Sequence, residues 1–393
     1  MAGPAPTTSW GKSIERILPE VRELRRALHR RPEVAFREEG TARLVRSFLE
    51  EHGAGTVVEG IAGHGFLVRI EGGGDGPALL LRADLDALPL KEASGMPYAS
   101  ERDGKHHACG HDGHMAMLAG ALAVLAARRD AWRGTVYGLF QPAEETGEGA
   151  KDVLGHDGIA DLPVDRTFAF HNLPGRPLGS VAVRDGPAAV ASTGVKVHYK
   201  GATSHASEPH AGRNPIPALA ALAGEVTSAP AMCLPYGTPA LATLIHVQAG
   251  GPRFGTSAGS GHLSATLRAD TDDDLEALVE HVRRLAERLA AAFDLSCDFE
   301  LVEPFPATVN DPGAVQQVRR AAEAAGLPLD FPARPQPWSE DYGHLAKQWP
   351  GALVILGAGE GQPALHSPGY DFPDGLLQPG IRLWLALVRQ GDA

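Results

Sequence analysis

The sequence contains few cysteines, no excess of basic residues and no long apolar segment. Three cysteines, Cys109, Cys233 and Cys297, occur among 393 residues. This low, odd number does not indicate a disulfide framework and favours a reducing, cytoplasmic location, where a thiolate stays free to bind metal. The formal net charge of -12 argues against nucleic acid and anionic membranes as partners, because both bind basic surfaces.

No signal peptide or membrane span is expected. Met1 to Trp10 has no basic region followed by an apolar run. The longest uncharged stretch, Val226 to Pro252, is interrupted by prolines and contains His246 and Gln248, so it cannot form one apolar spanning helix. The 47 glycines and 31 prolines show no collagen-like period or low-complexity tract, which favours a loop-rich enzyme.

The length and the composition are those of a globular protein with a large α/β core and a second domain. A first amphipathic helix contains Leu24 and Leu28 and ends near Arg31, because Pro32 disfavours helical geometry in the residue before it. A second helix carries four apolar residues on one face: Leu44, Val45, Phe48 and Leu49.

Short apolar runs predict four strands in the first part of the chain, at residues 66–70, 78–81, 135–140 and 167–170. The first two are separated by the glycine-rich segment 72–77 and are expected to pair with each other. A helix is predicted over residues 112–126, with Asp112 as a possible cap.

Polar residues follow several of these strands. Three polar clusters stand at the ends of predicted strands: Asp84-Leu-Asp86, Gln141-Pro-Ala-Glu144-Glu145 and His171-Asn172. A further strand, predicted at 353–357, ends in Gly357-Ala-Gly359. Open α/β sheets bind ligands beyond the carboxyl ends of their strands. We therefore expect a pocket rim that is assembled from several loops.

The middle of the chain predicts a discrete inserted domain. Strands are expected at residues 193–200, 240–247, 263–269 and 297–302, and helices at 215–226 and 272–291. Their order is β-α-β-β-α-β, as in the ferredoxin-like split motif. We place this domain at residues 181–301, between two parts of a catalytic domain at 1–180 and 302–393.

The densest group of potential metal ligands is His106-His107-Ala-Cys109-Gly-His111-Asp112-Gly-His114. Thiolate and imidazole are preferred ligands of zinc and related metals. Cys109 and His111 lie two residues apart in a strand-to-helix loop, so both can turn toward one ion. Taken alone, the segment could equally be a histidine-rich surface loop with an incidental cysteine.

A pair of carboxylates, Glu144 and Glu145, follows the strand at 135–140. Such a pair is usually solvated, but this one lies on the expected rim. Neighbouring residues point in opposite directions, so one carboxylate can bind metal while the other acts as general base toward a metal-bound water, whose pKa falls toward about 7. His171 and His366 are further possible ligands, and it is the conjunction of these residues that favours a metal site.

Seven motifs, in order, resemble those of the metal-dependent amidohydrolases related to aminoacylases and carboxypeptidases. The branch that they fit includes hippurate hydrolase and the plant auxin-conjugate hydrolases. The resemblance runs from about Leu24 to the C-terminus and rests on these segments: Leu28-His-Arg-Arg-Pro32-Glu33, Arg82-Ala-Asp84-Leu-Asp86-Ala-Leu-Pro89, Cys109-Gly-His111-Asp112-Gly-His114, Phe140-Gln-Pro-Ala-Glu144-Glu145, Gly201-Ala-Thr-Ser-His205-Ala, Ser339-Glu340-Asp341 and His366-Ser-Pro.

The resemblance implies a zinc-peptidase-like catalytic domain, with a mixed central sheet flanked by helices, and an inserted ferredoxin-like lid and dimerisation domain. It also implies two divalent metal ions bridged by water or hydroxide, with zinc or manganese first and cobalt or nickel as alternatives. The implied metal ligands are Cys109, His111, Glu145, His171 and His366. Glu144 would be the general base and later the proton donor to the leaving amine. Asp84, Asp86 and Asp112 would support the ligands from behind.

The resemblance assigns substrate contacts to the inserted domain. His205 would stabilise the tetrahedral oxyanion, reaching into the site of a partner subunit, and Asn214 and Arg268 would hold the substrate carboxylate, although all three could be structural. Where many relatives have Asn-Val-Ile-Pro, this chain has Phe254-Gly-Thr-Ser-Ala-Gly259, which leaves the metal chemistry intact and changes the expected substrate clamp.

We therefore expect a homodimeric hydrolase of N-acyl amino acids or related small amides. A dipeptidase or carboxypeptidase with the same metals is the main alternative. A metal-storing or regulatory protein and a hydrolase with Cys109 as nucleophile are two further hypotheses. A zinc protease of the His-Glu-x-x-His type is excluded, because that motif does not occur.

Overall fold

The computed structural model describes residues 9–390. No signal peptide is expected at residues 1–10, and most of that segment lies outside the described residues. The chain divides into two compact units. Unit 1 contains the described residues up to Ala188, Val309–Arg334 and the described residues from Asp341, and unit 2 contains Ala189–Thr308 and Pro335–Glu340. No helix among residues 9–390 combines the length and the apolar character needed to cross a membrane.

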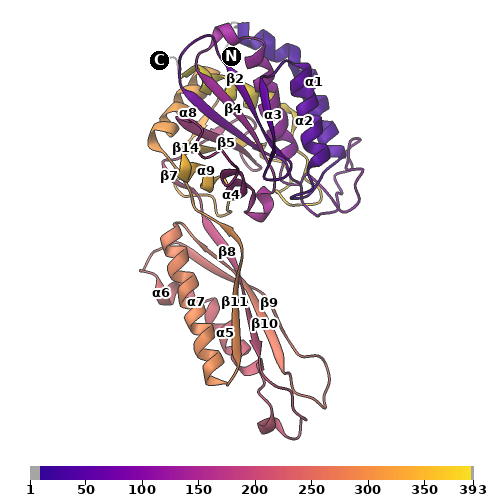
Figure 1. Ribbon diagram of the computed structural model, residues 1–393, viewed down its shortest axis with the longest axis vertical. Coiled ribbons are helices and arrows are strands. Elements are labelled where there is room, and N and C mark those ends of the chain that lie inside the picture. Colours follow the sequence, from indigo (N-terminus) through magenta and orange to yellow (C-terminus); the bar gives the residue numbers. More distant parts are fainter. Residues whose placement is uncertain (1–8, 391–393) are drawn as a thin grey trace. The chain divides into compact units, whose positions relative to one another are not determined.

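Unit 1 is built on an eight-stranded mixed sheet with the order β1-β2-β4-β3-β5-β14-β6-β13 (Figure 1). Its strands are β1 (Thr56–Ile61), β2 (Gly65–Glu71), β3 (Ala78–Asp84), β4 (Thr135–Gln141), β5 (Arg166–Leu173), β6 (Val181–Ala182), β13 (Leu329–Asp330) and β14 (Gly351–Gly357). Strands β4, β3, β5 and β14 are neighbours and parallel, so their carboxyl ends meet at one edge of the sheet. The predicted mixed α/β fold is confirmed.

The predicted pairing of the strands at 66–70 and 78–81 is wrong. Strand β4 lies between β2 and β3, antiparallel to the first and parallel to the second. The glycine-rich connection is held by the loop that precedes β4: the amide of Gly72 donates to the carbonyl of Gly134 (2.9 Å), and that of Gly73 to Trp132 (2.9 Å). These contacts hold the connection against the loop before β4, and β4 itself pairs with both strands.

Helices cover this sheet, and α1, α2 and α10 pack against the central helix α3 (His111–Ala126), which is buried along almost its whole length. The other helices of unit 1 are α1 (Ser9–Arg30), α2 (Glu39–Glu51), α4 (Gly149–Leu154), α8 (Pro312–Ala325), α9 (Gly343–Gln348) and α10 (Leu377–Arg389). Helix α1 ends two residues before Pro32, as predicted. Helices α1, α2, α3, α8 and α10 share one hydrophobic core with the sheet.

Unit 2 contains a four-stranded antiparallel sheet with the order β11-β8-β10-β9 (Figure 1). In chain order its elements are β8 (Ala191–Lys200), α5 (Ile216–Val226), α6 (Ala229–Cys233), β9 (Ala240–Ala249), β10 (Ser260–Ala269), α7 (Asp272–Ala292) and β11 (Ser296–Phe305). Alternate residues of β8 and β10, among them Val195, Val197, Leu263 and Leu267, form a core with α5 and α7. Two short strands, β7 (Gly186–Ala189) and β12 (Thr308–Asn310), pair separately.

Candidate metal centre

The carboxyl edge of the parallel strands brings the predicted ligands together. Asp84 and Gln141 are the last residues of β3 and β4, and His171 lies near the end of β5. Cys109 precedes α3. His366 lies on the loop after β14, and its backbone amide donates to the carbonyl of Ala108 (2.9 Å). The loop-built rim that the sequence predicts is thus present in unit 1.

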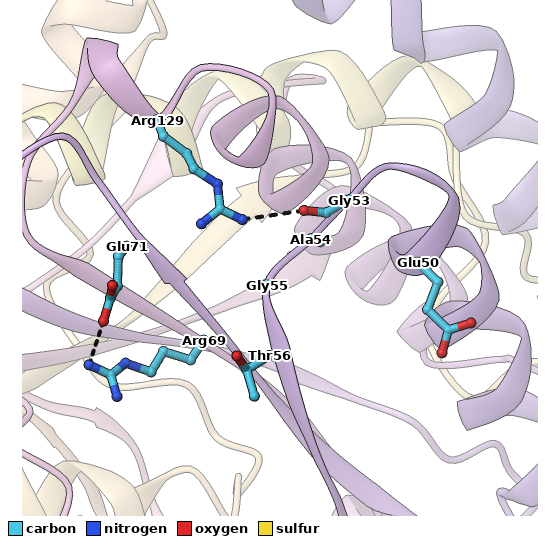
Figure 2. A pocket seen from close by; sticks show the side chains of 8 residues that line it. All are labelled: Glu50, Gly53, Ala54, Gly55, Thr56, Arg69, Glu71 and Arg129. Carbon is cyan, nitrogen blue, oxygen red and sulfur yellow. Dashed lines mark hydrogen bonds and ion pairs between the residues drawn. The ribbon is translucent and has the colours of Figure 1, made fainter.

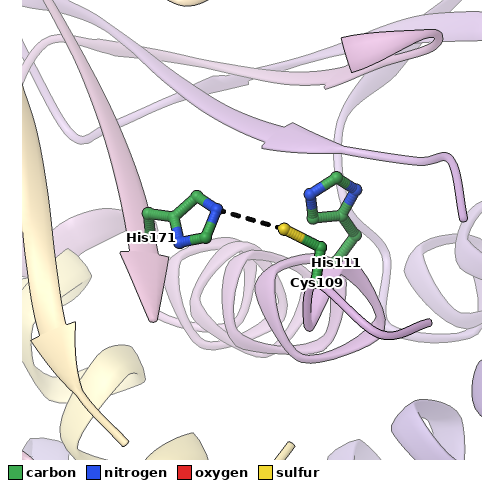
Figure 3. Close-up of side chains that lie close together, drawn as sticks. All are labelled: Cys109, His111 and His171. Carbon is green, nitrogen blue, oxygen red and sulfur yellow. Dashed lines mark hydrogen bonds between the residues drawn. The ribbon is translucent and has the colours of Figure 1, made fainter. Parts of the chain in front are cut away.

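Five side chains form the centre of this site. The Sγ atom of Cys109 lies 3.4 Å from Nε2 of His171 and 3.4 Å from Nε2 of His366. Figure 3 shows His171 from β5 facing Cys109, with His111 on the first turn of α3. Oε1 of Glu145 lies 3.7 Å from Nε2 of His366 and 3.9 Å from Nε2 of His111. His366 is exposed while Cys109, His111 and His171 are buried, so the cluster is reached from the His366 side.

A single glycine lets Cys109 and His111 face the same point. Gly110 has a φ of +92°, a left-handed conformation that residues with a Cβ rarely adopt. A Cβ at this position would also overlap the side-chain amide of Asn172. The helix therefore starts from Gly110, without a side-chain cap. The possible role of Asp112 as the N-cap is wrong, because Gly110 occupies that position; Oδ1 of Asp112 accepts instead from the amide of Gly113 within the first turn (2.9 Å).

Backbone carbonyls fix the tautomers of two histidines. Nδ1 of His111 lies 2.9 Å from the carbonyl of Asp86, and Nδ1 of His171 lies 2.8 Å from that of Asn172. A carbonyl only accepts, so each Nδ1 carries a proton, and the neutral form of each ring presents the lone pair of Nε2 to the cluster. This is the arrangement that metal-ligating histidines show in proteins.

Two buried polar atoms lack hydrogen-bond partners and point to a cation. Nε2 of His111 and Oε1 of Glu145 have no hydrogen-bond partner among the described residues, although such atoms are costly to bury without one. Zinc binds imidazole, carboxylate and thiolate at about 2.0–2.3 Å, which puts the ligands of one ion about 3–4 Å apart. The contacts between 3.4 and 3.9 Å fit that spacing. The five residues therefore fit divalent metal in both donor type and distance.

The electrostatics of the cluster also favour a cation. Burial, and then the nearby Glu145, raise the pKa of the Cys109 thiol well above its ordinary value. Burial also raises the pKa of Glu145, to about 7, against the opposing effect of His111. Both groups bind metal as anions, so a metal ion would stabilise the two charged forms that burial disfavours.

The two adjacent glutamates lie in a short 3₁₀ turn, η2 (Glu144–Thr146), directly after Ala143. The amide of Glu145 donates to Oδ2 of Asp86 (3.0 Å), which ties this turn to the loop after β3. Oε2 of Glu144 lies 3.8 Å from Nε2 of His111. Glu145 is thus near two of the histidines, and Glu144 is buried at the margin of the cluster.

Asp84 belongs to a buried network behind the cluster. Its Oδ1 accepts from Nδ1 of His114 (2.7 Å), and its Oδ2 accepts from Arg82 (2.9 Å). Arg82 also donates to Gln141 (2.8 Å) and to Asp341 (2.7 Å). Burial alone would raise the pKa of Asp84, but the charges of His111, His114 and Arg82 hold it well below its ordinary value. The sequence prediction gave no role to Arg82, His114 or Asp341, although each lies in a quoted motif.

Asp112 anchors a second buried network. Its Oδ2 forms an ion pair with Nε of Arg25 (2.9 Å) and lies 2.7 Å from Nδ1 of His29. The other ring nitrogen of His29 lies 3.2 Å from Glu92. Burial is outweighed by Arg25 and His29, which lower the pKa of Asp112. Asp112 thereby ties the ligand-bearing first turn of α3 to helix α1.

The predicted substrate-binding residues lie in unit 2. The amide of Ser207 donates to Nδ1 of His205 (3.2 Å), so the neutral ring carries its proton on Nε2. Oδ1 of Asn214 accepts from the amide of Ile216 (3.0 Å) at the start of α5, and Arg268 donates to Ser339 (3.0 Å). Both side chains thus contact neighbours within unit 2, and their contact with a substrate stays a prediction.

Residues 254–259, for which an altered substrate clamp is expected, pack beside His205. The amide of Ala206 donates to the carbonyl of Gly255 (3.1 Å), and that of Ser257 to Ser204 (2.9 Å). His205 and Thr256 form an isolated β-bridge. A change in residues 254–259 is therefore expected to change the position of the loop that holds His205.

A surface pocket of about 520 Å³ lies at the opposite end of the unit 1 sheet (Figure 2). It is lined by Arg69 and Glu71 near the end of β2, where Glu71 pairs with Thr135, the first residue of β4. Arg69 and Glu71 pair with each other at 2.6 Å, and Arg129 donates to Gly53 (3.3 Å). No histidine or cysteine lines this pocket, and we assign it no part in the site.

Comparisons with known proteins agree with this geometry. Residues 80–390 match the profile of Peptidase family M20/M25/M40. The chain is 32% identical over 354 residues to the N-acetylcysteine deacetylase of Bacillus subtilis (strain 168), covering 90% of this chain and 92% of that protein. It is 28% identical over 355 residues to thermostable carboxypeptidase 1 of Saccharolobus solfataricus, covering 88% and 89%.

Among solved structures, the chain is similar to a Bacillus subtilis protein described as a dinuclear metal binding peptidase from the M20 family. The TM-score is 0.81 and the sequence identity 29%, over 95% of this chain and 98% of that one.

Proposed function

The chain belongs to peptidase family M20/M25/M40, whose members are metal-dependent hydrolases of amides, and from this premise we propose that it hydrolyses an N-acyl amino acid or a related small amide. The observation that carries the proposal is the pair of carboxylates in η2. Glu145 lies close to both His111 and His366, as expected of a metal ligand. Glu144 lies beside the cluster, near His111, and can act as the base.

Cys109, His111, Glu145, His171 and His366 would hold two divalent ions. Such ions lower the pKa of a coordinated water toward about 7 and polarise the substrate carbonyl. Glu144 then accepts the proton of the attacking water and returns it to the nitrogen of the leaving amine. Zinc and manganese suit this mixed donor set, and cobalt and nickel are alternatives.

His205 would stabilise the oxyanion of the tetrahedral intermediate. The bond from the Ser207 amide to Nδ1 supports this role, because it leaves Nε2–H as a donor. We propose that His205 acts in the site of a second subunit. Arg268 and Asn214 would contribute to the binding of the substrate carboxylate from the same unit.

A homodimer through unit 2, as a lid and dimerisation domain, is part of this proposal. Strand β9 is the edge of the four-stranded sheet and exposes Leu241, Ile245 and Val247. An exposed apolar edge strand favours pairing with a second copy of the chain. The free thiols of all three cysteines support the proposed cytoplasmic location.

The experiment is amino-acid release from a panel of N-acetyl, N-benzoyl and indole-acetyl amino acids and dipeptides. Chelator-stripped protein is assayed before and after addition of zinc, manganese or cobalt. Glu144→Gln should abolish release while metal content stays unchanged, and Glu148→Gln, at an exposed position in the following segment, should have no effect. Full activity of Glu144→Gln would refute the proposed base.

A dipeptidase or carboxypeptidase is the second candidate, and the similarity to a carboxypeptidase favours it. The dipeptides in the panel separate the two candidates. A nucleophilic Cys109 is disfavoured because burial raises the pKa of its thiol. That mechanism would survive chelation and be lost on alkylation. Stoichiometric metal without turnover of any amide would favour a metal-storing protein instead.

A further inference from the structure

Glu38 is a buried carboxylate to which the reaction assigns no role. It stands at the N-terminal end of α2 and is fully buried. Its Oε1 accepts from the amide of Phe36 and from the amide of Ala143, both at 2.9 Å. Ala143 immediately precedes Glu144, so one oxygen of Glu38 connects the α1–α2 loop to the turn that holds the proposed base.

Both residues that donate to Glu38 have left-handed backbones. The φ of Phe36 is +60° and that of Ala143 is +55°. This conformation costs a residue with a Cβ about 1–2 kcal/mol, so it persists only where other contacts hold it. At Ala143 the left-handed backbone turns the chain from β4 into η2. The hydrogen bond to Glu38 is the contact that holds the Ala143 amide in place.

A second carboxylate holds the other side of the same turn. The amide of Glu145 donates to Oδ2 of Asp86 (3.0 Å). The amides on either side of Glu144 are therefore each bound to a carboxylate from another loop, Glu38 on one side and Asp86 on the other. Asp86 also contacts His111, whereas the bonds of Glu38 run only to backbone amides.

We propose that Glu38 is a positioning residue that sets the place of Glu144 by holding the left-handed turn at Ala143. This inference rests on the proposed function of Glu144. Replacing Glu38 by alanine leaves the buried Ala143 amide without an acceptor and frees the turn to relax. A displacement of a reacting group by about 1 Å costs on the order of 100-fold in rate.

The test compares Glu38→Ala, Glu38→Gln and the control Glu39→Ala. Glu39 is the next residue on α2, but it is exposed and makes only a surface pair with Arg43 at 3.9 Å. We expect Glu38→Ala to lower kcat about 100-fold with little change in KM or metal content. Glu38→Gln keeps an oxygen acceptor and should restore most of kcat, and Glu39→Ala should equal wild type.

Hydrogen–deuterium exchange supplies a readout that does not depend on activity. Glu38→Ala should speed exchange in the peptide that spans residues 141–147, and Glu39→Ala should not. Wild-type kcat in Glu38→Ala, or equal damage in the alanine and glutamine variants, would overturn the inference. If Glu38→Ala does not fold, Glu38→Asp, whose carboxylate is one methylene shorter, is measured against the same outcomes.

The two proposals fail in different ways. If the wild-type protein cleaves no amide with any metal, the proposed function fails, and exchange at residues 141–147 alone decides whether Glu38 holds the turn. If the wild type is active and Glu38→Ala is equally active, only the role of Glu38 is refuted.

Discussion

Replacing Arg82 by methionine should destabilise unit 1 far more than replacing any surface arginine. Arg82 is almost completely buried and donates to three different side chains, those of Asp84, Gln141 and Asp341. Methionine fills most of the volume but neutralises none of the charge. Two buried carboxylates then lose their guanidinium partner at once.

The burial of these groups sets the size of the effect. The side chains of Arg82, Asp84 and Asp341 are each 1% exposed or less. Removing one partner of a buried ion pair costs about 3–5 kcal/mol, because the remaining charge stays out of water. We expect a loss of that size for Arg82→Met.

The chain contains a matched control two strands away. Arg69 on β2 pairs with Glu71 at 2.6 Å, the same two-residue spacing by which Arg82 on β3 pairs with Asp84. Arg69 and Glu71 are 52% and 64% exposed, and exposed pairs contribute about 0–1 kcal/mol. Arg69→Met should therefore change the free energy of unfolding by 1 kcal/mol at most.

The assay is urea unfolding of both variants and the wild type, followed by tryptophan fluorescence, with the metal content matched. A second variant, Arg82→Met with Asp341→Asn, should recover part of the loss, because one uncompensated charge is removed. If Arg82→Met costs no more than Arg69→Met, the buried network does not stabilise the fold as we argue.

Three other predictions follow from the structure. Gly110→Ala should lose metal and about 1–3 kcal/mol of stability, because its φ is +92° and its Cβ would overlap Asn172; unchanged metal content would contradict this. Burial, and then Asp86, raise the pKa of Glu38 to about 7 in the folded protein, from 4.5, so the folded state holds an extra proton between these values. The stability of the wild type relative to Glu38→Gln should therefore be greatest below about pH 4.5 and fall as the pH rises through 7, measured as the difference between thermal midpoints; a constant difference would refute the shift. Ile245→Asp on the edge of β9 should convert the proposed dimer to monomers in sedimentation, and a monomeric wild type would refute the interface.

The sequence predicted the rim of the site better than the layout of the sheet. The polar residues at the carboxyl ends of β3, β4 and β5 could be predicted because each follows an apolar run, and parallel strands place such ends together. No local sequence pattern indicates that β4 lies between β2 and β3. This position depends on contacts such as that of Gly72 with Gly134, which only the folded chain brings together.

Site residues could be predicted where residue type marks them, and were missed where only contacts in the folded chain do. The Cys109–His111 segment stands out by residue type. Asp112 was expected either to support the ligands or to cap a helix, and its contacts with Arg25 and His29 on α1 have no local sequence pattern. Glu38 is an ordinary glutamate in a charged stretch, and only the left-handed backbone at Ala143 reveals what it holds.

The wide spacing of the ligands along the chain bears on the order in which the protein is made. His366 meets Cys109 across 257 residues, with all of unit 2 encoded between them. Strand β14, which leads to His366, is also the neighbour of β5 in the sheet. During synthesis the ribosome releases the N-terminal strands and the inserted unit before the last ligand exists. The nascent chain therefore passes through a long stage with an incomplete metal centre, which ends only when His366 has been synthesised.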